Sequence, residues 1–80
     1  MNTRMHNIKR GADGLTVMQR RFIDAYMGPA RYNATQAAKL AGYSQRTAYS
    51  IGHELKNKPH VRAAIDRRFA EHIREIRSAN

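Results

Sequence analysis

Apolar and small residues recur along this chain at the three- and four-residue spacing of α-helices, and glycine or proline residues separate the segments that show it. In the first segment the apolar side consists of Met18, Phe22, Ala25 and Tyr26. The pattern predicts helices at about residues 16–27, 34–41, 45–56 and 60–77. No segment alternates polar and apolar residues as a strand does. We therefore expect an all-α fold with about four helices, the last one long.

Local start and stop signals agree with these helices. Thr16, followed three residues later by Gln19, forms a capping box at the start of the first helix. Asn33 can cap the second helix, and Gly42 stands where a helix commonly ends with positive φ. Ser44 can cap a third helix only two residues later. A corner this short favours two steeply crossed helices, the helix-turn-helix arrangement.

The two central helices are expected to pack closely. The second helix has small residues at its inward positions, namely Ala34, Ala37, Ala38 and Ala41. Bulky side chains there would push two steeply crossed helices apart. In the third helix, Gly52 permits the same close approach beside an inward stripe of Ala48, Ile51 and Leu55.

The last helix carries more apolar residues than a small core can cover. Its stripe consists of Val61, Ala64 or Ile65, Phe69, Ile73 and Ile76. The first half can close the core, whereas Ile73 and Ile76 are left exposed or meet another chain. Self-association through this helix and a solvated tail are the two alternatives.

The charge balance points to nucleic acid. Lys+Arg 15 against Asp+Glu 6 gives a formal net charge of +9 in 80 residues. An anionic membrane would also attract such a surface, but the basic residues are spread over several elements. No apolar run approaches the roughly 20 residues of a membrane span, and the N-terminus does not resemble a secretory signal. We expect a partner of double-stranded DNA, no membrane association and an intracellular location.

An enzyme is not expected. The four histidines, His6, His53, His60 and His72, include no metal-binding pair at i, i+4. Cysteine is absent, and so are a glycine-rich phosphate loop and a G-x-S-x-G motif. No catalytic residue, metal ligand or cofactor is therefore predicted.

The third helix is the predicted recognition helix, with its N-terminus entering the major groove. Arg46 suits a guanine and Gln45 an adenine. The side chains expected to face bases or nearby phosphates are Ser44, Gln45, Arg46, Thr47, Tyr49, Ser50 and His53. Phosphate contacts, which position a protein without reading sequence, are expected from Arg20, Arg21, Arg31, Lys39, Lys56, Lys9 and Arg10.

Three regions follow from these assignments. Residues 1–14 are predicted to form a flexible basic N-terminal arm that follows DNA, with an ordinary frayed terminus as the alternative. Residues 15–77 form the helical DNA-binding domain, and residues 78–80 form a tail.

Several motifs together resemble a known family. They are LTxxQxxFxxxY from Leu15, NATQAAxxAGYS from Asn33, and PxV from Pro59. In this combination the chain resembles, over about residues 15–66, the small subunit of tailed-bacteriophage terminases. The resemblance implies a non-catalytic DNA-recognition subunit. Such a subunit binds the packaging-initiation site on viral DNA and recruits a large subunit with ATPase and nuclease activity, in the cytoplasm of the host cell.

The resemblance also implies an assembly. Family members form homo-oligomeric rings through a central helical domain and are longer than this chain. The 80 residues are therefore expected to be the N-terminal DNA-binding domain, with a monomer as the alternative state for the fragment. Two other functions stay open: a helix-turn-helix transcriptional regulator or transposase-type DNA-binding domain, and a protein-interaction module for an acidic partner.

Overall fold

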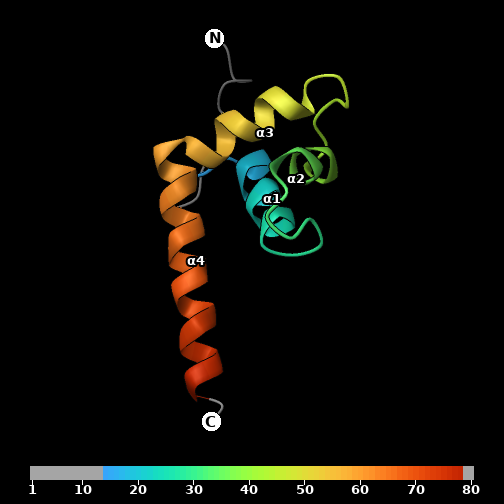
Figure 1. The fold of residues 1–80 in the computed structure, drawn as a ribbon. Coiled ribbons are helices and arrows are strands. Elements are labelled where there is room, and N and C mark those ends of the chain that lie inside the picture. The colour runs from blue at the N-terminus through green and yellow to red at the C-terminus, as the bar shows by residue number, and fades with distance from the viewer. Residues whose placement is uncertain (1–13, 79–80) are drawn as a thin grey trace.

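The computed structural model describes residues 14–78, which form helices and contain no strand (Figure 1). The helices are α1 (Val17–Tyr26), α2 (Ala34–Ala41), α3 (Ala48–Asn57) and α4 (Pro59–Ser78). The predicted all-α class with a long last helix is confirmed. The predicted basic arm, with Lys9 and Arg10, lies outside the described residues except for Gly14.

The helices begin and end at the predicted signals, with one exception. The Thr16 hydroxyl oxygen accepts from the Gln19 N–H at 3.1 Å, and Gln19 Oε1 accepts from the Thr16 N–H at 3.0 Å, which completes the capping box. Asn33 Oδ1 accepts from the Gln36 N–H at 3.0 Å at the start of α2. Gly42 ends α2 with a φ of 111°, a conformation that strongly favours glycine.

The exception is the start of the third helix, which is Ala48 and not Gln45. Ser44 does not cap α3, because its hydroxyl oxygen accepts from the Arg46 N–H at 3.1 Å and its carbonyl accepts from the Thr47 N–H at 3.1 Å. These local hydrogen bonds hold residues 45–47 in a turn. Serine can satisfy the backbone in a turn as well as at a cap, so the sequence signal was ambiguous.

Close packing in the centre follows from small residues. Ala37 and Ala38 of α2 are completely buried, and α2 packs against both α1 and α3. A Cβ atom added to Gly52 would lie 2.4 Å from the Ala34 carbonyl oxygen, well inside van der Waals contact. The predicted close approach at Gly52 is therefore confirmed, and its partner is the first turn of α2.

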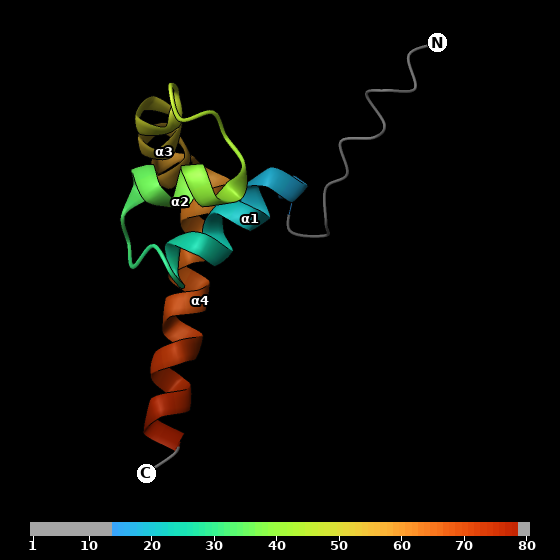
Figure 2. The ribbon, with the colours of Figure 1, turned by 90° about the vertical axis from the view of Figure 1, so that its right-hand side faces the viewer.

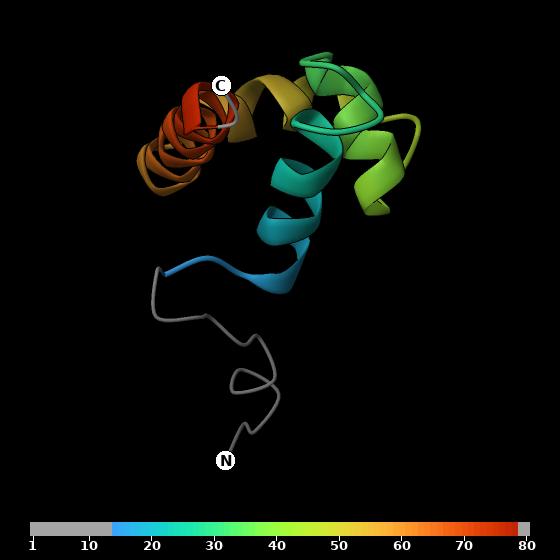
Figure 3. The same ribbon diagram turned by 90° about the horizontal axis from the view of Figure 1, so that it is seen from below.

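The core is completed by aromatic and branched side chains from the outer helices. Phe22, Ile23 and Val61 are fully buried, and Tyr26 stacks on Phe22 with ring centroids 5.6 Å apart. Phe22 and Tyr26 are thus core residues, as the helical spacing predicts. Seen from below, α1 runs between α4 on one side and α2 on the other (Figure 3). We call residues 15–65, which enclose this core, the head.

The long helix α4 leaves the head after its first two turns. Lys58 alone separates α3 from α4, and the chain changes direction there, so that α4 projects away from the other helices (Figure 2). Its buried residues are Val61, Ala64 and Ile65. Further along, Phe69, Ile73 and Ile76 are 46%, 37% and 53% exposed. The surplus apolar stripe is confirmed, while its self-association stays a prediction.

Two contacts hold α4 to the head just beyond the core. Arg68 Nη2 donates to Asp24 Oδ1 of α1 at 2.6 Å. The Phe69 ring meets the Tyr32 ring edge to face, with centroids 6.5 Å apart. Tyr32 and the preceding Arg31 both have positive φ, 69° and 49°. These contacts orient the projecting part of α4 relative to the head.

Candidate nucleic-acid interface

The outward face of α3 is polar and open to solvent. The inward face carries Ala48, Gly52 and Leu55, which are buried. At about 100° per residue, Ser50 and His53 lie nearly opposite these buried positions. The structure leaves all seven predicted recognition residues exposed: Ser44, Gln45, Arg46, Thr47, Tyr49, Ser50 and His53.

The later start of α3 changes how four of these residues are presented. Ser44, Gln45, Arg46 and Thr47 lie in the turn before the helix, and only the other three lie on α3 itself. The turn is held by the two hydrogen bonds to Ser44 and by the Thr47 hydroxyl, which donates to the Ser44 carbonyl at 3.3 Å. Gln45 and Arg46 therefore project from an ordered corner at the N-terminus of α3.

Arg21 contacts Met18, which lies near the end of α2. Its Nη1 atom is 4.0 Å from the Met18 sulfur, and the Met18 methyl carbon is 3.6 Å from where a Gly42 Cβ would stand. Met18 thus bridges Arg21 to the end of α2. Arg21 itself is exposed.

Arg20, although adjacent in sequence, faces a different direction. It lines a groove of about 200 Å³ between α1 and α4, together with Ile23, Ala64 and Arg67 among others. Successive residues of a helix differ by about 100° in direction, so two neighbouring arginines need not serve the same surface. Arg20 and Arg21 therefore lie on different sides of α1.

The other predicted phosphate contacts are spread around the head. Lys39 is exposed in the last turn of α2, one turn before the corner. Arg31 is exposed in the connection that precedes α2, and Lys56 is half-buried in the last turn of α3. Among the predicted phosphate contacts, Lys39 and Arg21 lie near the end of α2 that leads to Gly42. Arg31 lies before the other end of α2.

Two features of α3 were not assigned from the sequence. Tyr49 is 65% exposed, and its ring lies 4.5 Å from the His53 ring at an interplanar angle of 57°. Glu54 is also exposed, on the flank of α3 opposite Tyr49, and would repel a phosphate. The spacing of four residues between Tyr49 and His53 could have predicted their ring contact from the sequence. The presence of Glu54 in the helix could have predicted the negative charge.

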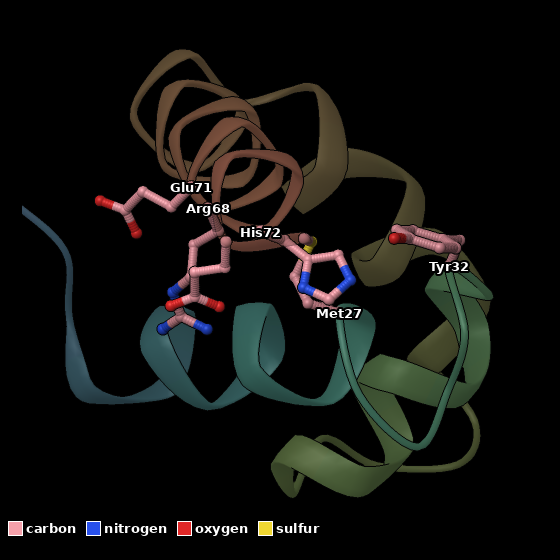
Figure 4. Close-up of a pocket in the computed structure, with 6 residues that line it drawn as sticks. Met27, Tyr32, Arg68, Glu71 and His72 are labelled. Carbon is pink, nitrogen blue, oxygen red and sulfur yellow. The ribbon is translucent and has the colours of Figure 1, made fainter. Parts of the chain in front are cut away.

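The structure has another hollow, which is lined by several polar side chains. A hollow of about 290 Å³ between the end of α1 and α4 is lined by Met27, Tyr32, Arg68, Glu71, His72 and Glu75 (Figure 4). Arg68 is already paired with Asp24, and the hollow has both signs of charge. Within residues 14–78, no group of three or more His, Cys, Asp or Glu side chains could hold a metal ion.

Two further observations concern the described part of the chain. None of its helices combines the length and the apolar character needed to cross a membrane. Burial raises the pKa of the Tyr43 phenol, which packs beside the core just after Gly42. The corner is therefore anchored on its inner side by a neutral aromatic residue.

The amino-acid sequence is similar to known proteins. Residues 15–79 match the family described as "Terminase small subunit". The chain is 49% identical over 51 residues to the terminase small subunit of Bacillus phage SPP1, a match that covers 64% of this chain and 34% of that protein. It is 47% identical over 57 residues to the terminase small subunit of Bacillus phage SF6, covering 71% of this chain and 39% of that protein. The matched region is thus well under half the length of these relatives. Since the family match includes nearly every described residue, the chain belongs to the terminase small subunit family.

Proposed function

We propose that this chain is the DNA-recognition part of a phage terminase small subunit, which binds the packaging-initiation site on viral DNA without catalysing a reaction. The observation that carries the proposal is the corner between α2 and α3. There an ordered turn presents Gln45 and Arg46 at the N-terminus of α3. This is the geometry with which a helix-turn-helix protein places a recognition helix in the major groove.

Charge supports the same proposal. The chain has a formal net charge of +9, which attracts the DNA backbone before any base is read. Arg21 and Lys39 lie at the corner end of α2 and are the best-placed phosphate contacts. In addition, the N-cap residue Thr47 makes no side-chain hydrogen bond to the first turn of α3. The first N–H donors of that helix therefore have no side-chain cap, and a helix N-terminus favours phosphate.

We further propose that the full-length protein recruits a large subunit with ATPase and nuclease activity, in the cytoplasm of the infected host cell. A subunit described as "small" implies a larger partner, and the matched region covers only 34% to 39% of the relatives' length. The exposed stripe of Phe69, Ile73 and Ile76 supports assembly of a homo-oligomer through α4.

A salt titration tests DNA binding itself. If the protein contacts about five phosphates, log K should fall with log salt with a slope near −4.5. The measurement is fluorescence anisotropy of labelled duplex DNA between low and physiological salt. A flat response, or no affinity at low salt, would overturn the proposal and favour an acidic protein partner.

Point variants test the assigned face. Arg46→Ala and Gln45→Ala should weaken binding to the cognate site with little effect on random DNA, whereas Lys39→Ala should weaken both by similar factors. Arg74→Ala, on the projecting part of α4, removes the same charge far from the corner and serves as the matched control. Equal losses for Arg46→Ala and Arg74→Ala would refute the recognition face.

A further inference from the structure

Tyr49 is an exposed aromatic residue at the start of α3. It is the second residue of α3, directly after the corner, and 65% of it is exposed. The other side chains on the outward face, including Ser50 and His53, are polar. A single exposed aromatic residue is ordinary on a protein surface, so exposure alone decides nothing. Its place in the first turn of the proposed recognition helix is what gives it significance.

The ring of Tyr49 is also braced. His53, one turn further along α3, packs against it with centroids 4.5 Å apart. This contact limits the rotation of the tyrosine side chain before any partner arrives. A side chain that is already restrained loses less conformational entropy on binding, which favours a role in recognition.

The flank on which Tyr49 lies is the one that suits DNA. Lys56 shares this flank of α3, whereas Glu54 lies on the other. A DNA duplex is expected to lean toward the lysine and away from the carboxylate, because its phosphates are negative. Tyr49 would then lie on the flank that approaches the groove, next to the corner.

The chemistry of the major groove narrows what Tyr49 can read there. Base edges present hydrogen-bond donors and acceptors, and the C5 methyl group of thymine is the apolar feature among them. A tyrosine ring is an apolar surface with one polar tip. We propose that Tyr49, braced by His53, reads a thymine methyl group in the target site. This inference rests on the proposed function and adds a component of the sequence that the head recognises.

Deoxyuridine provides the test, since it differs from thymidine only by that methyl group. Duplexes bound by the 80-residue chain are first selected from a random-sequence pool. Each thymine of a selected duplex is then replaced by uracil in turn, and the affinity is measured by anisotropy. Replacement at one thymine should weaken binding about fourfold, the factor expected for one buried methyl group.

Variants assign the effect to Tyr49. Tyr49→Ala should bind the thymine and uracil duplexes equally, and Tyr49→Phe should still prefer thymine. A Tyr49→Phe protein that loses as much affinity as Tyr49→Ala on the thymine duplex would show that the hydroxyl, and not the ring, makes the contact and would overturn the inference. The exposure of Tyr49 means that neither variant should lower the melting temperature appreciably.

The remaining outcomes separate this inference from the proposed function. Salt-dependent DNA binding with no uracil effect at any position, or selected sites without thymine, would overturn the reading of a methyl group and leave DNA binding intact. A uracil effect that persists unchanged in Tyr49→Ala would assign the methyl contact to another residue and overturn the inference. Absence of DNA binding at low salt would overturn both proposals.

Discussion

The contact between Gly52 and α2 makes a sharp prediction about stability. In Gly52→Ala, the new methyl carbon would lie 2.4 Å from the Ala34 carbonyl oxygen and 2.7 Å from the carbon bonded to it. An ordinary contact requires about 3.4 Å or more, so α2 and α3 must separate by about 1 Å. The obstructing atoms belong to the backbone and cannot rotate away as a side chain would.

Two effects oppose each other in this variant. Alanine is about 1 kcal/mol better than glycine in a helix interior, which would stabilise α3. Overpacking of a close contact costs typically about 1–3 kcal/mol, and here the clash is with backbone on a helix that contacts both α1 and α3. Because backbone atoms obstruct the methyl group, the cost should lie at the upper end of that range, about 2–3 kcal/mol. The net loss is then about 1–2 kcal/mol. For a domain of this size, that lowers the melting temperature by roughly 4–16 °C.

Thermal unfolding followed by circular dichroism measures the effect. Ser50→Ala is the matched control, because it lies on the exposed face of the same helix and should change the free energy of unfolding by less than about 0.5 kcal/mol. A melting temperature of Gly52→Ala at or above that of the unsubstituted chain would mean that helix propensity outweighs the close approach. The argument from the Ala34 contact would then be refuted.

Two further predictions concern DNA affinity and alkaline stability. Glu54→Gln should tighten DNA binding at low salt about twofold, because repulsion between a carboxylate and a phosphate about 8 Å apart costs ~0.5 kcal/mol in water. Unchanged or weaker binding would contradict the placement of Glu54 near the DNA. The folded-state pKa of Tyr43 is raised above 10.0, so the unfolded chain loses this proton first. The stabilisation by the neutral phenol is complete below pH 10 and is lost as pH rises further. The urea midpoint of the unsubstituted chain should therefore fall relative to that of Tyr43→Phe between pH 9 and pH 11. A constant difference between the two midpoints over this pH range would contradict the prediction.

Much of this fold is determined by interactions between residues close in sequence. The Thr16–Gln19 capping box, the Asn33 cap and the positive φ of Gly42 involve at most three residues of separation. Such signals act before any tertiary contact forms, so they can be read directly from the chain. The motif NATQAAxxAGYS from Asn33 combines several of them, which explains why it identified the family as well as the helix ends.

The start of α3 shows where local signals fail. Ser44 can cap a helix or close a turn, and both use the same hydroxyl oxygen. The outcome depends on whether α3 can reach its buried position with Ala48 completely buried and Gly52 against Ala34. Those contacts form only when α2 and α3 pack together, so the sequence does not reveal them. The sequence pattern therefore placed the start of the helix at Gln45.

By itself, the sequence determined the all-α class, the corner, the surplus apolar residues of the last helix and the family. Tertiary structure alone decided which surfaces those residues share. It placed Met18, which Arg21 contacts, near Gly42, and it brought Arg20 into a groove beside α4. It also set the direction of α4 through the pair of Arg68 with Asp24, residues 44 positions apart. The physical reason is that helix signals act within one turn, whereas the orientation of a side chain or helix depends on distant residues that only folding brings into contact.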